Sequence, residues 1–193
     1  MVVHVPVRNP VLLRPGPAAG FVETEGVVSI EAEHYSSAVA PPDRQWLLIP
    51  DHGRTLSGMA PLPADAPALE ATKEGMYLEY QMHVFTPGKV KVLTTLAPTQ
   101  KFQPGPGLRY AVSLDDEAPQ IVNIHADESR ATWGRSVADG AVVFTTEHAI
   151  ESAGAHTLRF WVIDPGLVLQ KLVVDTGGLK PSYLGPPESP RFN

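Results

Sequence analysis

Residues 76–84 read MYLEYQMHV, and this stretch decides the fold class because apolar and polar side chains alternate along it without interruption. A period of two places every second side chain on one face, as in a β-strand that buries one side. Residues 28–33, 89–92 and 108–114 follow the same pattern. No window of a dozen residues keeps a clear 3.6-residue period, so the sequence predicts an all-β chain.

Short clusters of turn-forming residues separate the apolar stretches. They stand at residues 86–88, 115–117, 138–140, 153–154 and 164–166, and they consist mostly of Pro, Gly, Asp and Ala. Such clusters are typical of tight connections between strands. About eight short strands with regular breaks indicate a two-sheet antiparallel β-sandwich.

The two ends of the chain differ in composition from the middle. Residues 1–22 contain several prolines and no sustained period, which predicts an extended arm or linker. Residues 23–176 form the predicted sandwich. Residues 177–193 are also rich in proline, so we expect an extended tail. The tail has apolar residues that could anchor it to the sandwich as a clamp, and a free end is the alternative; these residues are Leu179, Tyr183 and Leu184.

Composition limits the classes of partner. A chain of 193 residues is the size of a single domain with a substantial core. Its 15 Lys and Arg residues against 21 Asp and Glu residues give a net charge of -6, without a basic cluster. We therefore expect no nucleic-acid partner. There is no cysteine, so disulfides and thiolate metal sites are excluded. No apolar run has the length of a signal core or a membrane span, so we expect no membrane partner.

The sequence offers no paired acid and base. Asp115, Asp116 and Glu117 are adjacent at a predicted hairpin turn, where their side chains would point outward. Glycoside hydrolysis needs two carboxyl groups that face each other across a sugar, about 5–9.5 Å apart. The seven histidines are scattered, with no spacing typical of a nucleophile or a metal cage. We therefore predict a domain without catalytic residues.

Two tryptophans in predicted polar loops are the candidates for a carbohydrate-binding surface. Tryptophan rings stack on the apolar faces of sugars, and arginine binds carboxylates such as that of a uronate. The candidate residues are Trp46 with Arg44 and Arg54, and Trp133 with Arg130 and Arg135. The alternative is that both rings fill the ends of the sandwich. Trp161 lies in a predicted strand, and we expect it in the core or beneath a loop.

Glu31 and Glu33 are the candidate metal ligands. Their positions in one strand place both carboxylates on the same face, about 7 Å apart. Hard oxygen ligands at that spacing suit Ca²⁺, so the pair predicts a calcium site. The alternative is that both glutamates are solvated or bonded to arginine or backbone groups.

Several separated blocks of the sequence resemble a known family, and they occur in the same order as in that family. They are residues 28–35 (VSIEAEHY), 109–116 (RYAVSLDD), 154–159 (GAHTLR) and 162–189, which begins VIDPG. Together they resemble the C-terminal domain of glycoside hydrolase family 115, the xylan α-glucuronidases. The resemblance implies a jelly-roll sandwich similar to carbohydrate-binding modules, and a non-catalytic accessory domain of a xylan-degrading enzyme. It would bind or position glucuronoxylan or a related plant polysaccharide beside its parent catalytic domain.

The same resemblance leaves alternatives open. The domain could serve only to complete the parent enzyme or to form a homodimer, without affinity for sugar. The parent would be secreted or periplasmic. The sequence IEAE at residues 30–33 is also similar to the first strand of carbohydrate-binding module families 6 and 35. There both glutamates hold a structural calcium with an Asp from the last strand, whereas the matching position here is Gln170 or Lys171.

Overall fold

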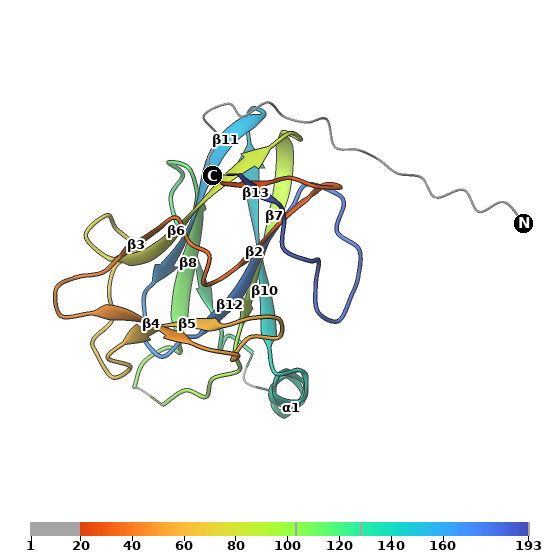
Figure 1. Ribbon diagram of the computed structural model, residues 1–193. Coiled ribbons are helices and arrows are strands. Elements are labelled where there is room, and N and C mark those ends of the chain that lie inside the picture. The colour runs from red at the N-terminus through yellow and green to blue at the C-terminus, as the bar shows by residue number, and fades with distance from the viewer. Residues whose placement is uncertain (1–19, 103, 128, 193) are drawn as a thin grey trace, which may run out of the picture.

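The computed structural model describes residues 20–102, 104–127 and 129–192, and its architecture is a sandwich of two β-sheets (Figure 1). The predicted fold class is confirmed. Residues 1–19 of the predicted N-terminal arm lie outside the described residues. Among the described strands, neighbours pair antiparallel except β1 with β6.

The first sheet contains seven strands in the order β13-β1-β6-β11-β8-β9, with β3 also paired to β6. Its strands are β1 (Gly20–Val22), β3 (Ser37–Val39), β6 (Met76–Val84), β8 (Arg109–Leu114), β9 (Gln120–Asn123), β11 (Gly154–Val162) and β13 (Arg191–Phe192). The second sheet contains six strands in the order β10-β7-β12-β5-β4, with β2 also paired to β12. Its strands are β2 (Val27–Glu31), β4 (Gln45–Ile49), β5 (Gly58–Leu62), β7 (Gly88–Leu96), β10 (Val142–Ile150) and β12 (Leu169–Asp175).

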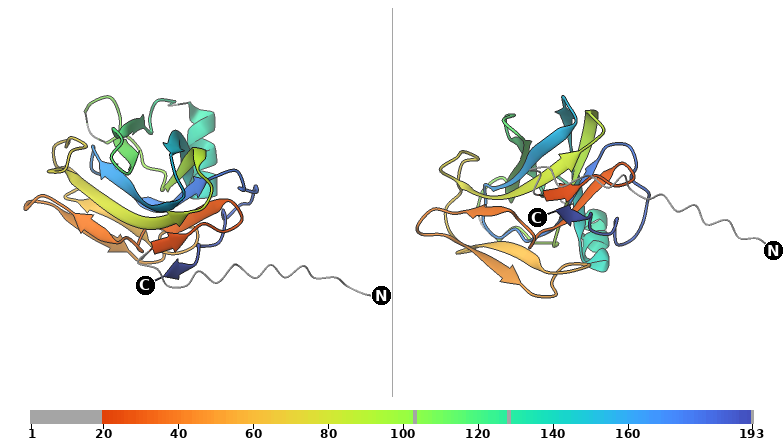
Figure 2. Two further views of the ribbon diagram at one scale, coloured as in Figure 1. Left: turned by 90° about the horizontal axis from the view of Figure 1, so that it is seen from above. Right: turned by 45° about the horizontal axis from the view of Figure 1, so that its top comes forward.

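The core lies between the two sheets, which are seen from the end in Figure 2. Along β6 buried and half-buried residues alternate strictly, as the sequence pattern predicts. Tyr80 is fully buried on this strand and its hydroxyl donates to the carbonyl of Ala32 at 2.8 Å. Burial raises the pKa of Tyr80 well above its usual range, so this hydroxyl stays protonated.

Residues 20–22 belong to the sandwich and not to the arm. They form β1, which pairs in parallel with β6 through Phe21 and Met82. Phe21 is almost completely buried in the core. The expected boundary at residue 22 is therefore too late, because three residues of strand are too few to show a period.

One helix, α1 (Arg130–Asp139), departs from the all-strand expectation. It stands at the end of the sandwich, between β9 and β10 (Figure 1). Ser129 caps its start by accepting a hydrogen bond from the backbone of Thr132 at 3.2 Å, and Gly140 ends it with a φ of 63°. The helix is defined by its caps and has no continuous apolar stripe, so a search for a 3.6-residue period misses it. In the part of the chain that the structure describes, we find no helix that could span a bilayer.

The C-terminal tail returns across the second sheet. Ser189 exchanges two hydrogen bonds with the backbone of Ser29, each at 2.9 Å, and the carbonyl of Pro190 accepts from Val22 at 2.8 Å. The carboxylate of Glu188 accepts from the backbone of Glu31 at 3.0 Å. These contacts hold residues 188–190 against β2 and β1, whereas Tyr183 and Leu184, two of the residues that we expected to anchor the tail, are 63% and 51% exposed.

Candidate functional site

A hollow of about 350 Å³ opens at the end of the sandwich beside α1. It is lined by the β7–β8 connection, the residues after β9, α1 and the start of β10. Trp133 lies on α1 and lines this hollow with 37% of its surface exposed. Lys101 lines the same hollow from the β7–β8 connection and is also exposed. An aromatic ring and a cation are thus both accessible at one opening.

His125 fixes the wall of this hollow. Its Nδ1 accepts a hydrogen bond from the backbone of Leu108 at 3.1 Å, and its Nε2 donates to the carbonyl of Thr99 at 2.8 Å. This pattern requires the neutral tautomer with the proton on Nε2. The ring therefore ties the β7–β8 connection to the segment after β9, and both sides of the opening are held in place.

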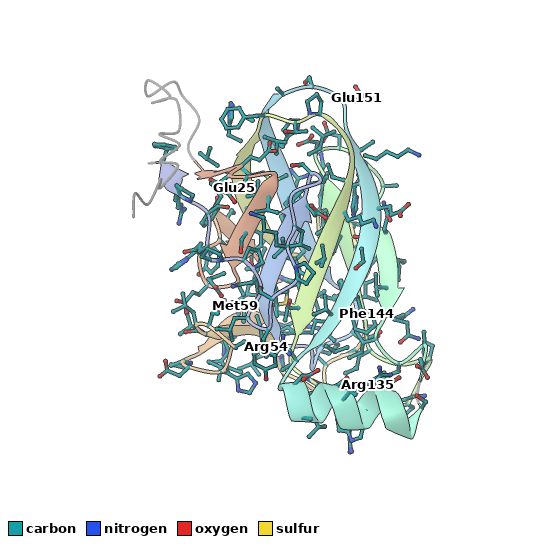
Figure 3. All side chains as sticks on the ribbon, turned by 90° about the vertical axis from the view of Figure 1, so that its right-hand side faces the viewer. Glu25, Arg54, Met59, Arg135, Phe144 and Glu151 are labelled. Atoms are coloured by element: carbon teal, nitrogen blue, oxygen red, sulfur yellow. The ribbon has the colours of Figure 1, made fainter. Side chains whose placement is uncertain are left out.

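Asp127 joins the hollow to the start of α1. Its carboxylate accepts hydrogen bonds from the hydroxyl of Thr132 at 2.7 Å and from the backbone of Ser129 at 3.0 Å. The hydrogen bond from Thr132, followed by those from Ser129, lowers the pKa of Asp127, and Arg135 adds to this effect. The carboxylate is therefore ionised at neutral pH. Arg135 lies exposed on α1 (Figure 3) and contributes positive charge near this carboxylate.

The structure brings one of the two predicted tryptophan clusters to an accessible opening. Trp133 and Arg135 lie on α1 and not in a loop, and Trp133 reaches the hollow. Arg130 begins the same helix, but its side chain lies outside the described part. Sequence reasoning missed Lys101 and His125, because each becomes part of the site only when the β7–β8 connection folds against the segment after β9.

The second predicted cluster does not assemble. Trp46 lies on β4 and not in a loop; its ring packs against the core, and its Nε1 donates to the carbonyl of Val39 at 3.1 Å. Arg44 has a side chain that is only 4% exposed and donates to the carbonyl of Pro67 at 2.8 Å. Both side chains make hydrogen bonds within the fold, and the ring of Trp46 is not displayed in a loop.

Arg54 connects the tail to the helix. Its Nε donates to the carbonyl of Asp139 at 3.0 Å, and its Nη1 donates to the carbonyl of Tyr183 at 2.8 Å. The guanidinium also lies 4.6 Å from the centre of the Tyr183 ring. Figure 3 shows Arg54 on the side of the sandwich near α1. These interactions use Nε, Nη1 and one face of the guanidinium within the fold.

The carboxylates of the β8–β9 turn close that turn. Asp115 accepts from the backbone of Thr157 at 2.8 Å and pairs with Nδ1 of His156 at 2.7 Å. Glu117 accepts from the backbone of Leu114 at 2.7 Å and pairs with His148. None of these carboxylates faces another across an opening.

One hydroxyl, imidazole and carboxylate are aligned in the manner of a catalytic triad. Nε2 of His148 lies 2.7 Å from the hydroxyl of Thr146, and Nδ1 pairs with Glu117. Thr146 and His148 are both buried, so no substrate reaches the hydroxyl. The alignment therefore joins the two sheets and does not form a catalytic centre.

The surroundings of Glu31 and Glu33 do not fit a calcium ion. Oε1 of Glu31 lies 2.8 Å from the ammonium of Lys171 and accepts the hydroxyl of Thr55 at 2.7 Å. The side chain of Glu33 lies 3.7 Å from Nε2 of His34. Within the described ranges no three His, Asp or Glu side chains gather as metal ligands would. A divalent ion at Glu31 would have to share its carboxylate with a positive charge already in place.

The fold and its end hollow define the chain as a jelly-roll β-sandwich module. The model of the glycosyl hydrolase family 115 C-terminal domain matches residues 20–188, so the chain belongs to that family. It corresponds to the C-terminal part of such enzymes, and the resemblance seen in the sequence is confirmed.

Solved structures share this fold at low sequence identity. One is BtGH115A, described as a family GH115 4-O-methyl-α-glucuronidase with specificity for decorated arabinogalactans; the TM-score is 0.53 at 17% identity. The match covers 72% of the present chain and 17% of that enzyme. Another is the C-terminal family 6 carbohydrate-binding module of LamC, a marine laminarinase from Zobellia galactanivorans. Its TM-score is 0.50 at 15% identity, and the match covers 77% of the present chain and 98% of that module. No curated protein matches the chain.

Proposed function

We propose that this domain is a non-catalytic carbohydrate-binding module that holds a xylan-degrading enzyme on glucuronoxylan or a related acidic plant polysaccharide. The observation that supports this best is the exposed ring of Trp133 in the same hollow as Lys101. The hollow of about 350 Å³ is in the range of sites that take small ligands.

The chemistry of the hollow suits a uronate-bearing sugar. The ring of Trp133 offers an apolar face for the C–H side of a pyranose. Lys101 has no ion-pair partner among the residues that the structure describes, so its ammonium is available to a carboxylate. Gln100 and Asp127 line the same hollow with groups that can bind sugar hydroxyls.

The relatives support a carbohydrate ligand. The domain shares its fold with a family 6 carbohydrate-binding module and with part of an α-glucuronidase described as specific for decorated arabinogalactans. A polysaccharide that bears glucuronate side groups would suit both the α-glucuronidase activity described for one relative and the aromatic ring and cation in the hollow. The parent catalytic domain is then the partner that this module positions.

The test measures binding of glucuronate-bearing xylo-oligosaccharides and of their carboxyl-reduced forms by titration calorimetry. Trp133→Ala should weaken both by about 1–3 kcal/mol, roughly 5- to 150-fold, as truncation of a binding hot spot does. Lys101→Ala should weaken only the ligand that keeps its carboxylate. Val137→Ala is the matched control, since Val137 is exposed on the same helix and does not line the hollow. Wild-type protein that binds neither ligand, or an unchanged affinity in Trp133→Ala, would refute the proposal.

A second function, assembly of the parent enzyme without sugar affinity, is favoured by β4. This strand is at the edge of its sheet, and Leu47 and Leu48 are 41% and 44% exposed on it. Edge strands with exposed apolar side chains pair readily with another chain. Light scattering on the wild-type protein and on Leu48→Lys separates the two functions. A dimer that dissociates in the variant, together with no binding of sugar, would support assembly.

A further inference from the structure

Lys171 and Glu31 form a nearly buried ion pair between two adjacent strands. They are direct partners in the register of β12 and β2. Nζ of Lys171 lies 2.8 Å from Oε1 of Glu31, and the two side chains are only 6% and 4% exposed. A carboxylate this far from water requires a cation, because an unpaired buried charge is strongly unfavourable.

The ammonium of Lys171 contacts two oxygen atoms of the kind that bind hard metal ions. Besides Glu31, it donates to the carbonyl of Pro186 at 3.2 Å. The hydroxyl of Thr55 lies 2.7 Å from the same oxygen of Glu31. Carboxylate, backbone carbonyl and hydroxyl oxygens are the ligands that Ca²⁺ uses in proteins. The position is therefore a cation site, and the chain itself supplies the cation.

We propose that Lys171 is a built-in cation that replaces the divalent metal implied by the glutamate pair, so that the domain folds and holds its tail without calcium. The donor set described above does not fit Ca²⁺ because the ammonium occupies its place. A cation carried by a side chain loses no translational entropy on binding, and a chelator does not remove it.

The same ammonium attaches the tail. Pro186 belongs to the tail, and its carbonyl accepts from both Lys171 and the hydroxyl of Ser29, the latter at 3.1 Å. Lys171 therefore joins β12, β2 and the tail at one point. Attachment of the tail at Pro186 then depends on a residue of the chain and not on the calcium concentration outside the protein.

The experiment measures melting temperatures in a chelator and in excess Ca²⁺. Wild-type protein should give the same melting temperature in both. Lys171→Asp removes the ammonium and adds a carboxylate beside Glu31, so it should melt lower than wild type in the chelator. Excess Ca²⁺ should then raise its melting temperature by about 5–10 °C, because an ion that binds only the folded state stabilises it by mass action.

Lys180→Asp is the matched control. Lys180 lies in the tail, and its side chain is 82% exposed and pairs with Glu25 at the surface. This variant undergoes the same change of charge and should show no response to calcium. A calcium response in the wild-type protein, or none in Lys171→Asp, would overturn the proposal.

A second variant decides the matter if Lys171→Asp does not fold in either condition. Lys171→Met leaves Glu31 without a cation and should lower the melting temperature. The combined variant Lys171→Met/Glu31→Met removes both charges and should recover most of the loss. A double variant no more stable than the single one would show that Lys171 does not serve as the cation for Glu31.

Discussion

Glu23 is expected to hold together three connections at the end of the sandwich away from α1. Its side chain is buried, and its Oε2 accepts from the backbone of Phe85 at 2.5 Å and of Thr86 at 2.9 Å. Its Oε1 accepts from the hydroxyl of Thr176 at 2.6 Å. The β1–β2 turn, the β6–β7 turn and the end of β12 thus meet at one carboxylate.

We expect Glu23→Gln to lower the free energy of unfolding by about 2–3 kcal/mol at pH 7. The neutral amide oxygen of Gln can still accept from the backbones of Phe85 and Thr86, and its NH₂ group can donate to the hydroxyl of Thr176. The substitution therefore replaces three charge-assisted hydrogen bonds by weaker neutral ones. Hydrogen bonds to a charged group are worth about 1.5–3 kcal/mol each, and water can replace part of the loss because Phe85 and Thr86 are exposed. For a domain of this size the melting temperature should fall by about 4–12 °C.

The effect should depend on pH in one direction. Burial acts to raise the pKa of Glu23, but hydrogen bonds from Thr176, Thr86 and Phe85 outweigh it, so the pKa lies below its ordinary value of 4.5. A carboxyl group whose pKa is lower in the folded state than in the unfolded state stabilises the protein at pH values above its unfolded-state pKa. This stabilisation is lost as the pH falls through the folded-state pKa. The difference in the free energy of unfolding between wild type and Glu23→Gln should be largest at pH 7 and should decrease below about pH 4.5.

Urea denaturation of both proteins at several pH values between 7 and 3.5 checks this expectation. Glu25→Gln is the control, because Glu25 makes only an exposed surface pair and should cost less than about 0.5 kcal/mol. Equal stabilities of wild type and Glu23→Gln at pH 7, or a gap that widens on acidification, would refute the argument.

Other predictions follow from single contacts. Asp164→Asn should cost about 2–4 kcal/mol in denaturation experiments, because it breaks a two-pronged pair with Arg109 at 2.7 and 3.1 Å. Trp46→Ala should lower the melting temperature without changing retention on glucuronoxylan, since its ring packs against the core. Glu188→Gln should speed proteolysis within residues 177–193, which limited digestion and mass spectrometry can detect. The wild-type chain should release no glucuronic acid, xylose or acetate from xylan, and turnover abolished by one Asp or Glu substitution would contradict this.

The sequence predicts the strands well where burial is one-sided. Along β6 the alternation of side chains and the alternation of burial coincide, because a strand between core and solvent has both at a period of two. The helix α1 could not be found this way, since it is defined by the caps Ser129 and Gly140. Those two residues were the available signal, since they enclose a segment of ten residues without proline.

Site residues were harder to predict because their contacts depend on register and on long-range packing. Trp46 has polar neighbours in sequence, yet pairing of β4 with β5 places its ring against the core. Lys171 meets Glu31 only because β12 and β2 are aligned in one register, and no local pattern encodes that alignment. Lys101 and His125 likewise become neighbours of Trp133 only in the folded chain.

The pairing of β1 with β13 determines how the domain responds to mechanical tension. These strands run antiparallel, with Gly20 opposite Phe192 and Phe21 opposite Arg191. The chain therefore enters through one strand and leaves through its immediate neighbour (Figure 1). A pull between the two ends acts across this ladder and opens its hydrogen bonds one at a time, in the manner of a zipper. We expect β13 to detach first under load, while the longer strands β6 and β11 stay paired.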